Sequence, residues 1–185
     1  MKLLLDTCVL SEIRTKDGSA AVKNFVAALP ATALLLSVIT VGEITKGVSL
    51  LPDGQKKRDL DAWRIGLSGQ FADRILPVDQ ETAEIWGEMT ATGKKNGVTI
   101  PVADGLIAAT ALRHGLHVAT RNTAHFDVAG AMVINPWDGS AVLSSRQAGL
   151  PPRQGGSMKG KIWIADDFDA PDPEVEKLFN DGDNQ

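Results

Sequence analysis

Short apolar runs alternate with segments of helical periodicity between residues 2 and 134, and this alternation restricts the fold more than any other feature of the sequence. The runs at 2–5, 32–38, 75–78 and 117–120 predict strands, and 132–134 is a candidate for a fifth. Their apolar residues are continuous, as is usual for parallel strands that are covered on both faces. Strands that alternate with helices predict a three-layer α/β/α domain with a central parallel sheet of four to five strands.

The segments between these runs carry apolar residues at three- and four-residue spacing, which is typical of helices. Thr40 is expected to open one of them, Asp79 to cap another, and Gly115 to end the last in a left-handed turn. The expected helices cover residues 22–29, 40–51, 60–71, 80–96 and 101–114.

The composition changes after residue 138, which predicts three regions. Residues 1–138 form the folded domain. Residues 139–157 are rich in serine, glycine and proline with little apolar periodicity, so they are expected to be a flexible linker. Residues 158–185 cannot bury a core alone, and we expect this segment to dock on another surface or to stay disordered.

Charge divides the chain in the same way. The formal net charge of −4 at first argues against a nucleic-acid partner. Residues 157–185, however, contain three lysines and eight acids, whereas residues 1–156 contain sixteen basic and fifteen acidic residues. The first 156 residues alone are therefore compatible with RNA binding through a local basic patch, while the acidic tail would repel RNA.

Several classes of protein are disfavoured by what the sequence lacks. No apolar run is long enough to span a membrane, and the three leucines after Lys2 are too short for an export signal, so the cytoplasm is the expected compartment. The single cysteine, Cys8, excludes an internal disulfide framework. The three histidines lack the spacing of a zinc site, and no glycine-rich phosphate loop is present.

Three acids follow or precede the predicted strands at positions that suggest a shared site. Asp6 follows the first strand, Glu43 is expected in the first turn of the helix after the second, and Asp104 in the first turn of the helix before the fourth. The carboxyl ends of parallel strands line the crevice in which such sheets bind ligands. Carboxylates gathered there need cations, and Mg²⁺ or Mn²⁺ with oxygen ligands is the natural solution.

Each acid also has a purely structural interpretation. Asp6 could cap a helix that begins at Thr7. Thr40 and Glu43 fit the capping-box spacing, and Asp104 would interact favourably with the dipole of its helix. Only their combined placement at one edge of the sheet favours a site.

Ordered motifs give the chain a resemblance to PIN-domain toxins of the VapC and FitB type. They are residues 4–12 (LLDTCVLSE), 37–44 (SVITVGEI), 101–111 (PVADGLIAATA), 118–122 (VATRN) with Phe126, and 135–137 (NPW). The resemblance implies a PIN fold, RNA cleavage that depends on Mg²⁺ or Mn²⁺, and a homodimer held by an antitoxin partner. It suggests tRNA only as one small structured RNA among others.

The resemblance also implies roles for individual residues. Asp6 and Asp104 would hold the metal directly or through water, and Glu43 would orient or deprotonate the attacking water. Asn122 would be the fourth catalytic residue and would bind a metal-bound water through its amide oxygen. Thr7 and Thr120, together with Asn122, would supply supporting hydrogen bonds. Candidate phosphate contacts are Arg14, Lys16, Lys46 and Arg121.

Two positions depart from the family pattern. Cys8 stands where the family often has asparagine, and the neighbouring carboxylates are expected to raise its pKa. The fourth motif usually supplies a further acid, but Asn122 and His125 occupy the corresponding places, with Asp127 as a reserve. One tightly held metal ion is therefore expected rather than two.

The tail resembles the C-terminal arm of antitoxins that partner such toxins. Its central stretch, 159–171 (KGKIWIADDFDAP), would anchor Trp163 and Phe168 in a groove, and Lys159 or Lys161 would reach the carboxylates and displace the metal. Met158 after Gly155-Gly156-Ser157 suggests a joined second polypeptide, natural or engineered.

Two other functions remain open on the sequence. The same acids could serve a metal-dependent nuclease or phosphatase with another substrate, or the domain could bind RNA without cutting it. A phosphoacceptor receiver domain fits poorly, because paired acids after the first strand and a lone aspartate after the third are missing.

Overall fold

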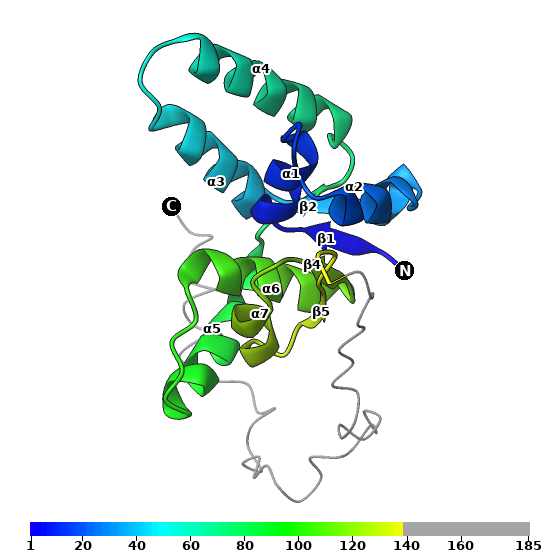
Figure 1. Ribbon diagram of the computed structural model, residues 1–185. Helices are drawn as coiled ribbons and strands as arrows, with labels where there is room; N and C mark the ends of the chain where they lie inside the picture. Colours follow the sequence, from blue (N-terminus) through cyan, green and yellow to red (C-terminus); the bar gives the residue numbers. More distant parts are fainter. Residues whose placement is uncertain (139–185) are drawn as a thin grey trace, which may run out of the picture. The chain divides into compact units, whose positions relative to one another are not determined.

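The computed structural model describes residues 1–138, and its centre is a five-stranded, all-parallel sheet in the order β3-β2-β1-β4-β5 (Figure 1). The strands are short. They are β1 (Leu3–Leu5), β2 (Leu34–Ser37), β3 (Ile75–Leu76), β4 (His117–Ala119) and β5 (Met132–Ile134). The predicted α/β class, the parallel sheet and the fifth strand are therefore confirmed.

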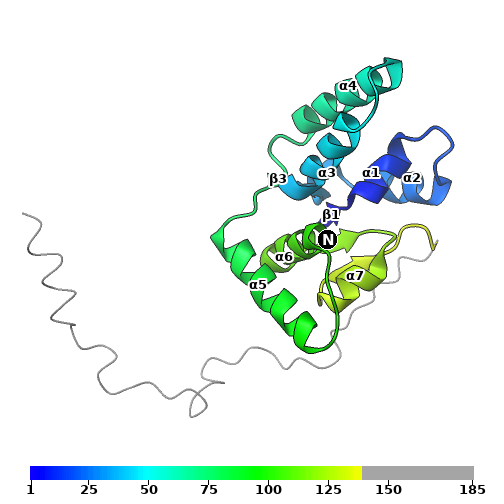
Figure 2. The same ribbon diagram turned by 90° about the vertical axis from the view of Figure 1, so that its left-hand side faces the viewer.

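Helices cover both faces of this sheet. One layer consists of α1 (Thr7–Arg14), α2 (Ala20–Ala27), α3 (Val38–Ser49) and α4 (Gln55–Gln70). The opposite layer consists of α5 (Gln80–Lys95), α6 (Val102–His114) and α7 (Thr123–Val128). Both views show the first four helices on one side of the strands and the last three on the other (Figure 1, Figure 2).

The central strand β1 explains why both faces are covered. Its three leucines are at most 1% exposed, and alternate side chains of a strand point to opposite faces. Leu3 and Leu5 pack into a cluster with Val22 and other side chains of the first layer, whereas Leu4 packs with Ile107 and the second layer. The continuous apolar run of β1 thus contributes side chains to both hydrophobic cores, as the sequence pattern predicted.

Helix α3 begins earlier than the sequence suggested. The prediction that Thr40 opens this helix is wrong: the Ser37 hydroxyl accepts a hydrogen bond from the Ile39 N–H, and the helix starts at Val38. Thr40 is instead fully buried, and its hydroxyl donates to the Leu5 carbonyl at 3.5 Å. Glu43 consequently lies in the second turn rather than the first, which excludes its predicted capping-box role.

The predicted caps of the later helices are confirmed. The carboxylate of Asp79 accepts a hydrogen bond from the Thr82 N–H at the start of α5. Gly115 ends α6 with a φ of 62°, a left-handed conformation that favours glycine.

Sequence periodicity missed two short helices and misplaced the start of one strand. α1 has eight residues and α7 has six, too few to give a periodic signal. A 3₁₀ turn at Ala31–Ala33 precedes β2, so the strand begins at Leu34 rather than Thr32.

The predicted linker (139–157) and antitoxin-like segment (158–185), with Lys159, Lys161, Trp163 and Phe168, lie outside the described residues. Among the helices of residues 1–138, none is long and apolar enough to cross a membrane.

Candidate active site

The order of the strands creates a switch point beside β1. This strand pairs with β2 on one side and with β4 on the other. The chain continues from β1 towards β2 and β3 and from β4 towards β5, so the connections after β1 and β4 run to opposite edges of the sheet. Ligands of open parallel sheets bind at the carboxyl edge at such a point. Asp6 and Thr120 are the residues that immediately follow β1 and β4 there.

Asp6 is almost completely enclosed, with 7% of its surface exposed. Its carboxylate accepts hydrogen bonds from the Thr120 hydroxyl and the Thr7 N–H, both at 2.6 Å, and from the Cys8 thiol at 3.1 Å. The bond from Thr7 caps α1, so the structural interpretation of Asp6 is correct. The cap, however, occupies only one of the two carboxylate oxygens of Asp6. Within residues 1–138, no lysine or arginine forms an ion pair with this carboxylate.

Glu43 reaches the same edge from α3. The Thr7 hydroxyl donates to its Oε2 at 2.6 Å, so Thr7 joins two acids, through its backbone N–H to Asp6 and through its side chain to Glu43. Glu43 and Lys46 also line an open groove of about 520 Å³ between α3 and the start of α6. Glu43 therefore faces both the network around Asp6 and an accessible surface.

Asp104 lies in the first turn of α6, as predicted, and its partner is His125 of α7. The distance from His125 Nδ1 to Asp104 Oδ2 is 2.6 Å, and Nδ1 is also 2.7 Å from the side-chain nitrogen of Asn122. A carboxylate can only accept, so Nδ1 must carry the proton that it donates to Asp104. The Asn122 amide nitrogen faces the same ring atom in the structure, and a 180° rotation of the amide would present its oxygen to that proton instead.

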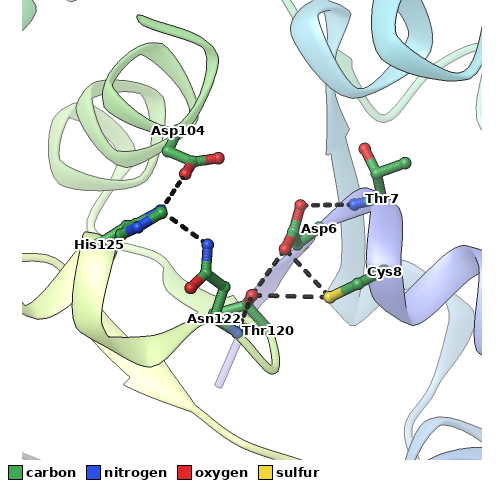
Figure 3. Close-up of polar contacts among 7 residues, drawn as sticks. All are labelled: Asp6, Thr7, Cys8, Asp104, Thr120, Asn122 and His125. Carbon is green, nitrogen blue, oxygen red and sulfur yellow. Dashed lines mark hydrogen bonds and ion pairs between the residues drawn. The ribbon is translucent and has the colours of Figure 1, made fainter. Parts of the chain in front are cut away.

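A continuous hydrogen-bonded network connects all three acids, and Figure 3 shows the part of it that runs from Thr7 and Asp6 to Asp104. Thr120 is its middle member, because its hydroxyl donates to Asp6 and accepts from the Asn122 N–H at 3.0 Å. The connected residues are, in order, Glu43, Thr7, Asp6, Thr120, Asn122, His125 and Asp104. The structure thus brings together all four residues predicted to be catalytic and both of the predicted supporting threonines.

His125 is the member that sequence reasoning left without a role. Its spacing from the other histidines does not fit a zinc site, and it occupies a position at which the family usually supplies a further acid. Its side chain is 43% exposed, so the second ring nitrogen is accessible while Nδ1 faces Asp104. The three-residue spacing from Asn122 was the available signal, but it becomes meaningful only once α7 is known to be a helix.

The donor set suits a hard divalent cation held largely through water. In the described part of the chain, no three histidine, cysteine, aspartate or glutamate side chains form a ready-made metal site. Mg²⁺ typically keeps several waters and binds through one or two carboxylates, and the oxygens of Asp6 and Asp104 match that preference. The uncompensated charge of the enclosed Asp6 also fits a cation.

Cys8 is a poor nucleophile in this setting. Burial, and secondly the charge of Asp6, raise the pKa of its thiol from 9.0 to about 11. The predicted direction is confirmed, although burial has a larger effect than the carboxylate. At neutral pH the thiol is protonated and acts as a hydrogen-bond donor to Asp6.

The predicted phosphate contacts lie in different places. Lys46 lines the groove beside Glu43, and Arg121 directly follows Thr120. Arg14 instead lies in the last turn of α1, and seven residues of helical rise place it about 10 Å along the axis from Thr7. Arg14 is therefore at the far end of α1 from the acids.

Comparison with known proteins identifies this architecture. Residues 3–131 match the family model of the PIN domain, so the chain belongs to the PIN-domain family. The toxin FitB of Neisseria gonorrhoeae is 41% identical over 136 residues, which are 73% of this chain and 98% of that protein. The VapC ribonuclease Y4jK of Sinorhizobium fredii is 37% identical over 140 residues, 74% of this chain and 98% of that protein.

Solved structures support the same assignment. The crystal structure of FitAcB from Neisseria gonorrhoeae matches with a TM-score of 0.69 and 41% identity, over 73% of this chain and 98% of that chain. A toxin–antitoxin complex from Klebsiella pneumoniae matches with a TM-score of 0.55 and 28% identity, over 73% and 98%. These relatives are matched over nearly their whole length, so about three-quarters of this chain corresponds to a complete relative.

Proposed function

We propose that this chain is the ribonuclease toxin of a toxin–antitoxin system and that it hydrolyses RNA phosphodiesters with Mg²⁺ or Mn²⁺. The observation that carries the proposal is the single hydrogen-bonded network through Asp6, Glu43 and Asp104 at the switch point of a PIN fold. The names of the relatives, a VapC ribonuclease and the toxin FitB, support RNA as the substrate.

The side chains divide the chemistry among them. Asp6 and Asp104 would hold the metal, which when bound lowers the pKa of a coordinated water and neutralises charge on the phosphate. Glu43 accepts the proton of the attacking water on Oε1, because Thr7 already occupies Oε2. The water oxygen then bonds to phosphorus, and the ester bond to the leaving oxygen breaks as that oxygen takes up a proton from solvent. Thr7 and Thr120 fix the carboxylates, so no reorganisation is needed during reaction.

A substrate comparison with isosteric variants tests this proposal. RNA, single-stranded DNA and a simple phosphate monoester are incubated with the protein with and without Mg²⁺. Asp6→Asn and Asp104→Asn should each lower RNA cleavage at least about a hundredfold, because each removes a metal-binding charge but keeps the shape. Asp73→Asn, a change at an acid that is 83% exposed and paired with Arg74, is the control and should cleave normally.

Two results would contradict the proposal. Preferred hydrolysis of the monoester or of DNA would favour a different phosphate-transfer enzyme. RNA cleavage that survives the Asp6→Asn change would show that Asp6 is not catalytic, whereas RNA binding without any cleavage would favour a non-catalytic RNA-binding module.

The C-terminal segment is proposed to act as a tethered antitoxin arm. A flexible linker of about 20 residues spans roughly 25 Å, which gives the arm an effective concentration on the order of millimolar. Truncation after Gly156 should then raise Mg²⁺-dependent cleavage, and changing Lys159 and Lys161 to alanine in the full chain should raise it in part. Unchanged activity after truncation would contradict the arm's inhibitory role.

The proposed partners follow from the same relatives. A separate antitoxin would bind this chain, as in the toxin–antitoxin complex from Klebsiella pneumoniae. A homodimer is proposed from the family resemblance. Small structured RNAs such as tRNA are the first substrates to test.

A further inference from the structure

Two arginines of the described domain are stacked on tryptophans, and only one stack lies beside the acids. The guanidinium carbon of Arg121 is 5.2 Å from the centre of the Trp137 ring, and that of Arg14 is 5.4 Å from the centre of the Trp63 ring. Arg121 follows Thr120, whose hydroxyl donates to Asp6. Arg14 is at the far end of α1, where it borders a small apolar cavity.

The stack at Arg121 is fixed from both sides. Trp137 is half-buried against the core of the first layer. Its backbone N–H donates to the Asn135 side-chain oxygen at 3.0 Å, which closes a tight turn. The Arg121 N–H donates to the Cys8 sulfur at 3.4 Å, and the Cys8 thiol in turn donates to Asp6. The backbone of Arg121 is therefore tied to the acidic centre, while its side chain lies along an indole.

The charge of Arg121 is available to a ligand. The residue is exposed, and within residues 1–138 no carboxylate forms an ion pair with it. Stacking uses the face of the guanidinium and leaves its N–H edges free to donate. A cation held next to an acidic centre without an acid of its own is well placed to hold an anionic group.

We propose that Arg121, oriented by Trp137, binds a backbone phosphate of the RNA next to the phosphodiester that is cut. The inference rests on the proposed ribonuclease function and adds a substrate contact to it. A planar guanidinium can donate two parallel hydrogen bonds to one phosphate, which fixes direction as well as distance. Arg121 thus sets where the strand lies relative to Asp6 and Asp104, and Cys8 and Trp137 act as positioning residues.

Matched charge changes at the two stacks test this proposal. Arg121→Ala, Arg121→Lys and Arg14→Ala are compared in the full chain and in the chain ended after Gly156. The shorter chain is suitable because about three-quarters of this sequence corresponds to a complete relative. Each protein is assayed for cleavage of a single-stranded RNA and, in EDTA, for binding of the same RNA at several salt concentrations.

Arg121→Ala should raise KM and weaken RNA binding about tenfold, with kcat changed by less than about threefold. It should also lower the slope of log affinity against log salt by about 0.7, the value for one phosphate contact in a single strand. Arg121→Lys should restore the slope but not the full affinity, because lysine lacks the planar fork. Arg14→Ala removes the same charge and should change binding by less than about twofold.

Equal effects of Arg121→Ala and Arg14→Ala would overturn the proposal, because general charge would then explain both. A loss confined to kcat would also overturn it. If the unaltered protein neither binds nor cuts RNA in either form, the proposed function itself fails and the Arg121 contact fails with it. Cleavage that is unaffected by Arg121→Ala refutes only the contact.

Discussion

At the scale of single residues, the site depends on two threonine hydroxyls that each hold one carboxylate oxygen. The Thr120 side chain is fully buried and donates to Asp6 at 2.6 Å, and Thr7 does the same for Glu43. Neutral hydroxyls are suited to this task because they orient an acid without cancelling its charge. A lysine in either place would compete with the metal for the same oxygens.

Thr120→Val tests this role. Valine has the same shape but leaves the buried Oδ2 of Asp6 with only the weak Cys8 thiol as a donor, so we expect a loss of about 1–3 kcal/mol in the free energy of unfolding and a lower kcat. Urea denaturation and RNA cleavage measure the two effects. Thr110→Val is the matched control, since Thr110 is equally buried but donates only to the Leu106 carbonyl within α6. Equal effects of the two changes on cleavage would contradict the assigned role.

The pKa of Cys8 gives a second prediction at this scale. Because burial and Asp6 raise the pKa of the folded thiol to about 11, the unfolded chain loses this proton at lower pH than the folded chain. The contribution of the protonated Cys8 thiol to the free energy of unfolding is therefore complete below pH 9 and is lost as the pH rises towards 11. Titration of the thiolate by ultraviolet absorbance, in metal-free protein, should give a midpoint near 11, and Asp6→Asn should lower it. A midpoint at or below the ordinary value of 9.0 would refute the assignment.

At the scale of secondary-structure elements, the sequence predicted those whose residues repeat a pattern several times. The strands and the longer helices fall into this group, because burial on one or two faces requires apolar residues at regular intervals along the sequence. Helices α1 and α7 gave no periodic signal because their short lengths leave too few repeats, so α1 was suggested only by its cap Asp6 and α7 was missed. The start of α3 was misplaced because Ser37 and Thr40 are both good capping residues, and only the structure shows that Thr40 is buried under Leu5.

The sequence predicted the acids of the candidate site but not the side-chain contacts that join its residues. Asp6 and Glu43 stand out because they follow predicted strands, and Asp104 because it lies in the first turn of the helix before the fourth strand. The contact between His125 and Asp104 joins residues 21 positions apart through α7, a helix that the sequence did not reveal. The Arg121–Trp137 stack likewise depends on the turn after β5, and no periodicity describes a turn.

The packing of α6 against α5 supports the position of Asp104 and gives a third prediction. An ideal β-carbon at Gly105 would lie 3.0 Å from both Cδ1 and Nε1 of Trp86. Gly105→Ala should therefore push the helices apart, lower the free energy of unfolding by about 1–3 kcal/mol and reduce cleavage by displacing Asp104. Gly66→Ala, in α4 with open space around it, should instead add about 0.5–1 kcal/mol. Thermal denaturation compares the two; a stabilising Gly105→Ala would refute this packing.

For the domain as a whole, an acidic centre to which residues 1–138 contribute no lysine or arginine partner links metal binding to folding. Mg²⁺ binds the folded acids and has no comparable site in an unfolded chain. At a hundredfold excess over its Kd, it should therefore raise the free energy of unfolding by about 2.7 kcal/mol. Denaturation with Mg²⁺ and with EDTA measures the difference, which Asp6→Asn and Asp104→Asn should each reduce. A shift that persists in both variants would place the metal elsewhere.

The position of β1 in the middle of the sheet has a consequence for the dynamics of the domain. Its leucines belong to both cores, and the Asp6 N–H donates to the Ala119 carbonyl of the neighbouring strand. This amide can exchange its hydrogen with solvent only when both layers separate, so its exchange should follow global unfolding. The first acid of the site is thus expected to lie in the slowest-opening part of the domain, where local opening of the outer helices leaves the carboxylate in place.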